Sequence, residues 1–201
     1  MKDLQISTRE TDIIIRELEQ TFVLDGDVVE FGCYAGDTSV LLAEALKRHP
    51  QKWLWLYDSF EGLPEKTAED SSAAGWRFKK GELKVDAETV AHKFRKLQLP
   101  DPVIKKAWFQ DLDAGNDLPS QICFALLDGD FYESIKTSFA LVAPKLVDYG
   151  VIVVHDYRNQ ELPGSARAVN EFLEAHSNYK LRLSSGLAII EKQPLNVEAQ
   201  D

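Results

Sequence analysis

The sequence predicts a three-layer α/β fold with one mostly parallel, seven-stranded sheet and helices on both of its faces. Strand and helix patterns alternate along the chain up to the last two strands, which is the order of a doubly wound sheet. Several strand candidates are continuous apolar runs, as expected where both faces of a parallel sheet are covered. The last two strands share the short turn SSG, which predicts a C-terminal antiparallel hairpin at the sheet edge.

The helices are predicted from apolar side chains at helical spacing and from residues that begin or end helices. Thr38 is a candidate N-cap for the second helix, and Pro50 follows the end of that helix. The predicted helices cover residues 9–22, 39–49, 86–97, 133–147 and 165–176.

The strands are predicted from short apolar runs bounded by turn residues. The clearest run is WLWLYDS, and ICFALLDGD and GVIVVHD are of the same kind. The predicted strands cover residues 28–32, 53–59, 102–108, 122–130, 150–156, 179–185 and 187–193.

Residues 61–85 form the longest irregular stretch between these elements. They are polar, contain glycine and serine, and hold two isolated aromatic residues, Trp76 and Phe78. A long loop in a compact α/β domain is usually a lid or a binding loop, and we expect that role here. Either aromatic residue is equally consistent with the core of a small subdomain. The rest of the chain is expected to complete a single domain over residues 1–201, with an N-terminal helix in residues 1–24.

Length, charge and cysteine content limit the class of protein. A chain of 201 residues is long enough for one well-buried core. Its 33 acidic and 23 basic residues give a net charge of −10, which argues against nucleic acid as a partner. Two cysteines, no apolar run of membrane-spanning length and no signal-peptide pattern at the N-terminus favour the cytoplasm and exclude a membrane partner.

Ligands of open α/β sheets bind beyond the carboxyl ends of the strands, so the residues there are the first candidates for a site. The first strand is followed by the loop Glu30-Phe-Gly32-Cys-Tyr34-Ala-Gly36. The spacing does not match the G-x-G-x-x-G pattern of dinucleotide binders, and Tyr34 stands where a pyrophosphate would need close backbone approach. The acidic Glu30 suits an ammonium or sulfonium group better than a phosphate. The same glycines would also serve a plain turn between strand and helix.

Asp58 ends the second predicted strand, twenty-eight residues after Glu30. A carboxylate there can accept both hydroxyls of a ribose, although aspartates also commonly cap turns. Together with the glycine loop, Asp58 predicts that the ligand is a nucleoside with a positively charged tail and no phosphate. S-adenosylmethionine fits that description.

The fourth and fifth predicted strands end in residue types that bind metals: Asp128, Asp130, His155 and Asp156. If these two strands are neighbours, the four groups meet at one edge of the sheet. Carboxylates suit Mg²⁺, and an imidazole moves the preference toward Mn²⁺, Fe²⁺ or Zn²⁺. Solvated loop acids and a histidine bonded to a nearby carbonyl are the simpler explanation.

Five segments of the chain together resemble a known family. They are Glu30-Phe-Gly-x-x-x-Gly36, Asp58-Ser-Phe-Glu-Gly-Leu-Pro64, Phe78-Lys-Lys-Gly-Glu-Leu83, Leu127-Asp-Gly-Asp-Phe-Tyr-Glu-Ser134 and Val154-His-Asp-Tyr157. In this order they resemble the macrocin O-methyltransferase family, which includes the sugar methyltransferases of tylosin, mycinamicin and novobiocin biosynthesis. The resemblance runs from about residue 27 to about residue 173, and DSFEGLP and DGDFYES are its specific parts.

The resemblance implies a Rossmann-like class I methyltransferase fold that binds S-adenosylmethionine. By this likeness Glu30, Gly32 and Gly36 line the methionine end of the cofactor, and Asp58 holds its ribose. The predicted cofactor site also includes Tyr34, Ser59 and Asp128.

The family also binds a divalent metal, usually Mg²⁺. The positions of its metal ligands are occupied here by Asp128, His155 and Asp156, and its proposed general base corresponds to Asp130. His155 replaces an aspartate of the family, which lowers the negative charge of the ligand set by one unit. Mg²⁺ stays the expected metal, and the histidine leaves weaker Mg²⁺ binding, a preference for Mn²⁺ or another ion, or loss of the metal open.

The sequence thus predicts metal-assisted methyl transfer from S-adenosylmethionine to a hydroxyl of a small molecule, a sugar or natural-product scaffold. Typical members are longer, chiefly at the N-terminus, where they carry segments that assemble subunits, so a homodimer stays open as an expectation. The alternatives are a metal-independent O- or N-methyltransferase of small molecules and a cofactor-binding subunit without catalysis. A nucleic-acid methyltransferase is disfavoured by the net charge.

Overall fold

The computed structural model describes residues 6–73 and 76–195. The strands are β1 (Asp27–Phe31), β2 (Leu54–Asp58), β3 (Val103–Lys106), β4 (Ile122–Leu127), β5 (Leu146–Val154), β6 (Tyr179–Ser184) and β7 (Leu187–Lys192). The α-helices are α1 (Thr8–Gln20), α2 (Asp37–Leu46), α3 (Ala87–Lys96), α4 (Tyr132–Val142) and α5 (Pro163–Ala175). Short 3₁₀ helices cover Thr21–Val23, Ala68–Asp70 and Phe109–Asp111.

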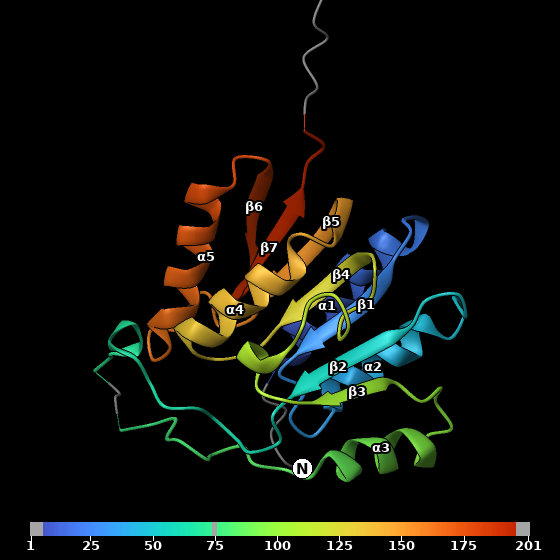
Figure 1. The fold of residues 1–201 in the computed structure, drawn as a ribbon, viewed down its shortest axis with the longest axis horizontal. Coiled ribbons are helices and arrows are strands. Elements are labelled where there is room, and N and C mark those ends of the chain that lie inside the picture. The colour runs from blue at the N-terminus through green and yellow to red at the C-terminus, as the bar shows by residue number, and fades with distance from the viewer. Residues whose placement is uncertain (1–5, 74–75, 196–201) are drawn as a thin grey trace, which may run out of the picture.

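The strands form one sheet in the order β3-β2-β1-β4-β5-β7-β6, with helices on both sides (Figure 1). Strands β1 to β5 are mutually parallel, and β7 runs antiparallel to both β5 and β6. The predicted mostly parallel, seven-stranded sheet with a C-terminal hairpin is therefore confirmed. The strand order reverses between β1 and β4, and this switch point is where open α/β sheets bind ligands.

Alternate side chains of the central strands enter two separate hydrophobic cores, because successive side chains of a strand point to opposite faces. Val28 of β1 joins the core under α1, α2 and α3, and its neighbour Val29 joins the core under α4 and α5. Leu126 and Leu127 of β4 divide in the same way. Burial on both faces explains why these strands are continuous apolar runs.

Three details of the predicted elements were wrong. The N-cap of α2 is Gly36, in a left-handed conformation with φ of 77°, so Thr38 lies inside the helix and does not cap it. The predicted helix 133–147 ends at Val142, because Pro144 follows and cannot donate an N–H to a further turn. Strand β5 begins at Leu146, where it pairs with Ile122 of β4, and not at residue 150.

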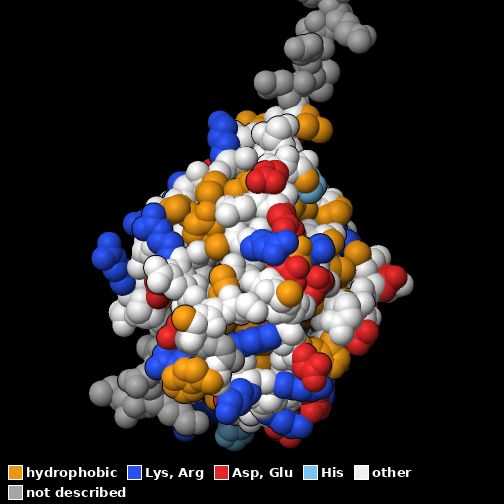
Figure 2. All heavy atoms as spheres, turned by 90° about the vertical axis from the view of Figure 1, so that its left-hand side faces the viewer, with side chains coloured by type: hydrophobic (Ala, Val, Ile, Leu, Met, Phe, Trp, Pro, Cys, Tyr) orange, Lys and Arg blue, Asp and Glu red, His pale blue; other side chains and the backbone are white. Residues whose placement is uncertain are grey.

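The described part of the predicted loop, residues 61–73 and 76–85, contains one short 3₁₀ helix and is otherwise irregular; residues 74–75 and 1–5 lie outside the described chain. An ion pair between Arg77 and Glu161, with N–O distances of 2.7 and 2.9 Å, joins the loop to the segment before α5. Figure 2 views the molecule from the side of α5 and this loop, and shows acidic, basic and apolar side chains intermixed there.

No helix within the described residues is both long and apolar enough to cross a membrane.

Candidate active site

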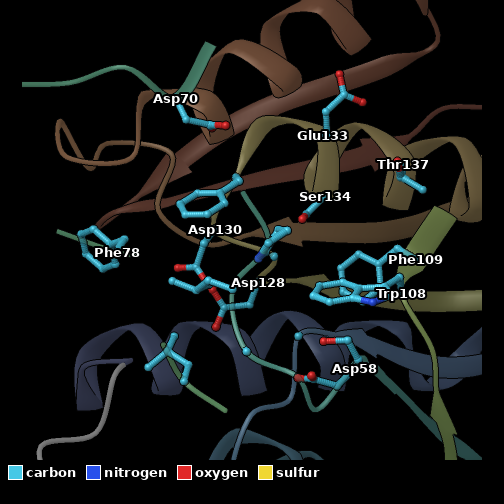
Figure 3. A pocket seen from close by; sticks show the side chains of 18 of the residues that line it. Asp58, Asp70, Phe78, Trp108, Phe109, Asp128, Asp130, Glu133, Ser134 and Thr137 are labelled. Atoms are coloured by element: carbon cyan, nitrogen blue, oxygen red, sulfur yellow. The ribbon is translucent and has the colours of Figure 1, made fainter. Parts of the chain in front are cut away.

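A cavity of about 540 Å³ opens at the carboxyl ends of β1, β2, β4 and β5. The 61–85 loop supplies part of its wall through Leu63, Phe78 and Leu83, and α4 supplies Ser134 and Thr137 (Figure 3). Trp76 does not line the cavity, and 67% of its surface is exposed. The cavity thus lies at the predicted edge of the sheet, between the strand ends and the loop.

The structure brings most of the predicted site residues to this one cavity. Glu30 and Gly36 are the two predicted residues that do not reach its wall. The predicted residues that line it are Gly32, Tyr34, Asp58, Ser59, Asp128, Asp130, His155 and Asp156.

Glu30 is buried behind the wall and is only 1% exposed. Its carboxyl group accepts a hydrogen bond from the hydroxyl of Ser39 in α2. Burial raises the pKa of Glu30 to about 8, and the charges of Asp128 and Asp58 contribute to this shift. Glu30 is therefore positioned to influence the charge of the site from beneath it.

The two glycines of the loop after β1 are required by the fold itself. Gly32 has a φ of 89°, and a Cβ there would lie 2.1 Å from the carbonyl oxygen of Asp128. Gly36 caps α2 with a positive φ, and a Cβ there would lie 3.0 Å from Val90 of α3. The close approach at Gly32 is what brings the end of β1 against the end of β4.

The carboxylate of Asp58 is held in a fixed orientation at the end of β2. One oxygen accepts the N–H of Tyr34 at 2.9 Å, and the other accepts the N–H of Phe60 at 2.7 Å. Burial raises the pKa of Asp58, and these two N–H groups partly offset that shift. Because each carboxylate oxygen has two lone pairs, both keep acceptor capacity toward the cavity.

Aromatic side chains beside Asp58 were missed by the sequence analysis. Trp108 and Phe109 follow β3 and line the cavity on the same side as Asp58 (Figure 3). They lie beyond the carboxyl end of a parallel strand, so the rule that located Asp58 applies to them too. They carry no charge, and the search for charged groups at strand ends therefore passed over them.

Asp128, His155 and Asp156 form a compact group at the ends of β4 and β5. One candidate ligand atom from each lies within 4.8 Å of the others. Nδ1 of His155 is 2.9 Å from Oδ1 of Asp128 and 3.1 Å from Oδ2 of Asp156. Asp156 and Asp130 have φ angles of 60° and 59°. Left-handed backbone of this kind in non-glycine residues is concentrated at functional sites.

Burial and neighbouring carboxylates shift the pKa values of His155 and of Asp130 strongly. Burial acts to lower the pKa of His155, but the two neighbouring carboxylates outweigh it and raise that pKa to about 12. Burial also raises the pKa of Asp130 well above its ordinary value, and Asp128 and Asp156 add to this shift. The site thus holds a carboxyl group that retains its proton more readily than a solvated one.

This group fits a divalent cation. Nδ1 of His155 is buried and makes no aligned hydrogen bond, although two carboxylate oxygens lie at hydrogen-bond distance from it. This nitrogen and the two carboxylate oxygens that it faces together form a suitable ligand set for Mn²⁺ or a similar ion. A cation and a proton would compete for Nδ1 of His155, because histidine binds metal ions only as the neutral imidazole.

Comparison with known proteins identifies the family. The family model described as Macrocin-O-methyltransferase (TylF) matches residues 11–182, which is most of the chain. The chain belongs to the macrocin O-methyltransferase family. The family resemblance predicted from the sequence motifs is therefore confirmed.

Two curated relatives from Streptomyces species are named as O-methyltransferases. The chain is 32% identical over 140 residues to the 8-demethyl-8-(2,3-dimethoxy-alpha-L-rhamnosyl)-tetracenomycin-C 4'-O-methyltransferase of Streptomyces olivaceus, a match that covers 66% of this chain and 53% of the relative. It is 29% identical over 155 residues to the demethyldecarbamoylnovobiocin O-methyltransferase of Streptomyces niveus, over 73% of this chain and 58% of the relative. The matched part thus spans a little over half of the length of each relative.

Solved structures of methyltransferases share the fold. The O-methyltransferase NovP superposes with a TM-score of 0.82 and 24% identity, covering 95% of this chain and 82% of NovP. The calicheamicin methyltransferase CalS11 gives a TM-score of 0.75 and 18% identity, over 92% of this chain and 80% of CalS11. A Bacillus cereus O-methyltransferase in complex with SAH gives 0.67 and 11%, over 95% of this chain and 84% of that one. The class I methyltransferase fold predicted from the sequence is thereby confirmed.

Proposed function

We propose that this chain transfers a methyl group from S-adenosylmethionine to a hydroxyl of a small molecule, a sugar or a natural-product scaffold. The observation that carries the proposal is that Asp58 and the Asp128–His155–Asp156 group line one cavity. A carboxylate suited to a ribose and a group suited to a cation in the same cavity would bring a methyl donor next to an activated acceptor. The two Streptomyces relatives, named as O-methyltransferases of a rhamnosyl-tetracenomycin and of a demethyldecarbamoylnovobiocin, support the acceptor class.

The charge of the cavity wall supports this cofactor over a phosphate-bearing one. Among the described residues that line the cavity, none is lysine or arginine, whereas Asp58, Asp128, Asp130 and Asp156 are all acidic. A sulfonium and an ammonium group are favoured in such surroundings, and a pyrophosphate is repelled. The cofactor's ribose would bond to the free lone pairs of Asp58. Trp108 and Phe109, on the same side, offer flat apolar surfaces to its adenine.

The residues at the ends of β4 and β5 would act on the acceptor. Asp128, His155 and Asp156 would hold a divalent cation, which lowers the pKa of a hydroxyl that binds to it. Asp130 lies on the same wall, and in its ionised form, which a bound cation would favour, it would take the proton of the acceptor hydroxyl. Phe78, Leu63 and Leu83 give the acceptor an apolar surface, and we propose that their loop covers it and excludes water.

The cofactor assignment is tested by calorimetry. Wild-type protein should bind S-adenosylmethionine at one site per chain, and Asp58→Ala should weaken that binding about tenfold or more, because a buried acceptor of two hydroxyls is lost. Asp148→Ala, an exposed aspartate near the start of β5, is the matched control and should bind as wild type does. Unchanged affinity in Asp58→Ala would remove the ribose assignment, and no binding by wild type would overturn the proposal.

Catalysis and metal dependence are tested together by release of S-adenosylhomocysteine. A panel of glycosides with free hydroxyls should include an acceptor, and chelation with EDTA should abolish its methylation. Added Mn²⁺ or Mg²⁺ should restore turnover. Full activity in EDTA would refute metal assistance and favour the metal-independent alternative, in which Asp130 acts as base alone.

A further inference from the structure

Glu10, in the first turn of α1, lies next to the cation-binding group although it is remote from it in sequence. Its Oε2 is 4.0 Å from Nε2 of His155. The side chains of both residues are largely buried, with 16% of Glu10 and 10% of His155 exposed. The two ring nitrogens of His155 thus face different carboxylates, since Nδ1 faces Asp128 and Asp156.

The carboxylate of Glu10 is held in place by donors from two other segments. The N–H and the hydroxyl of Ser7 donate to Oε2, at 3.2 and 2.6 Å, in the capping box that begins α1. The N–H of Gly186, in the turn between β6 and β7, lies 3.3 Å from Oε1 and donates to it. A Cβ on Gly186 would lie 2.6 Å from the same oxygen, so this turn leaves room for the carboxylate. Glu10 is therefore a fixed acceptor whose position does not depend on His155.

A histidine that binds a metal through one nitrogen usually donates its other N–H to a carboxylate, which fixes the tautomer and the orientation of the ring. Nδ1 is the nitrogen that faces the candidate cation position, so Nε2 carries the hydrogen of the neutral ring. Glu10 is the carboxylate that this N–H faces. An aspartate at position 155 would have no N–H to offer to it.

We infer that Glu10 is the positioning residue of His155: its carboxylate faces Nε2 at 4.0 Å and, with a cation bound at Nδ1, would accept the Nε2–H and hold the neutral ring with Nδ1 between Asp128 and Asp156. This inference rests on the cation site of the proposed function, and it deepens that proposal. It assigns α1 a role in the site, in addition to its packing against the sheet. Glu10 then has two roles, because it also completes the capping box with Ser7 at the start of α1.

The experiment is a calorimetric titration of the full chain with Mn²⁺ alone, without cofactor or acceptor. Glu10→Gln keeps the capping box, because glutamine also serves at that position, but removes the charge that faces Nε2. It should weaken Mn²⁺ binding about tenfold or more, the usual range for the loss of such a partner. Glu19→Gln is the matched control: it removes the same charge from an exposed glutamate near the other end of α1, so its Mn²⁺ affinity should equal that of wild type.

A double-mutant cycle separates positioning from the general attraction of a nearby negative charge. In a His155→Asp background, Glu10→Gln should change Mn²⁺ affinity no more than about twofold, because no ring remains to be held. An equal loss in both backgrounds, or no loss in the single variant, would overturn the inference. If wild type binds no Mn²⁺, the cation site itself fails, and the calorimetry with S-adenosylmethionine then decides separately whether the methyl-donor site stands.

Discussion

Glu30 provides a direct test of how burial and charge act in this site. It is enclosed behind the cavity wall and bonded to Ser39, and it has no positively charged partner among the contacts that the described residues show. Burial is the main cause of its raised pKa, opposed by the hydrogen bond from Ser39 and reinforced by Asp128 and Asp58. Glu30→Gln keeps the size and the acceptor oxygen for Ser39 and removes the ionisation.

The size of the effect follows from the two pKa values of Glu30. In the folded chain the pKa is about 8, compared with 4.5 as the ordinary value. The unfolded chain therefore releases this proton first as the pH rises. The stabilisation that Glu30 contributes is fully present below its unfolded pKa and is lost as the pH rises through its folded pKa. At about 1.4 kcal/mol per pH unit, wild type should lose about 2 kcal/mol relative to Glu30→Gln between pH 6 and pH 8.

The assay is urea denaturation of both proteins without metal, at several pH values in that interval. The free energy of unfolding of Glu30→Gln minus that of wild type should grow steadily with pH. Glu44→Gln, an exposed glutamate of α2, is the matched control and should follow wild type throughout. Parallel pH profiles for wild type and Glu30→Gln would refute the argument, because they would mean that Glu30 ionises in the folded protein as easily as in the unfolded one.

Three further substitutions test the packing around the site, each by urea denaturation. Gly32→Ala should lower the free energy of unfolding by about 3 kcal/mol or more, since its Cβ would meet the carbonyl of Asp128 at 2.1 Å with φ of 89°. Asp70→Ala should lower it by about 2 kcal/mol, because buried Asp70 accepts the N–H of Tyr132 at 2.8 Å and so caps α4. Arg77→Ala should change it by less than about 1 kcal/mol, because the ion pair with Glu161 is largely exposed. A smaller loss for Gly32→Ala than for Arg77→Ala would contradict this ranking.

The architecture was predictable because its signals are local. Apolar runs and helical spacing can be recognised within about ten residues, and their alternation determines the topology. The errors lie at element ends, where a single residue decides. Pro144 stops α4 and lets β5 begin early at Leu146, and the left-handed backbone at Gly36 replaces the side-chain cap expected from Thr38.

The strand-end residues of the site were predictable for a geometric reason. Parallel strands deliver their carboxyl ends to one edge of the sheet whatever the loops do, so Asp58, Asp128 and His155 meet there. The contributions of other segments depend on tertiary contacts. Asp70 caps a helix sixty-two residues away, and Glu10 reaches His155 only because α1 and the β6–β7 turn pack against that edge. No residue spacing in the sequence predicts either contact.

The glycine loop after β1 shows why a motif and its function can be separated only by structure. The family resemblance predicts that Gly32 lines the methionine end of the cofactor, and the fold requires a glycine there to let β1 approach the carbonyl of Asp128, ninety-six residues later. The two demands are connected, because that approach sets where Asp128 stands relative to Asp58 across the cavity. If Gly32 serves the cofactor only by placing Asp128, Gly32→Ala should weaken Mn²⁺ binding as well as stability. A variant that lost stability while keeping its Mn²⁺ affinity would show that the two demands are independent.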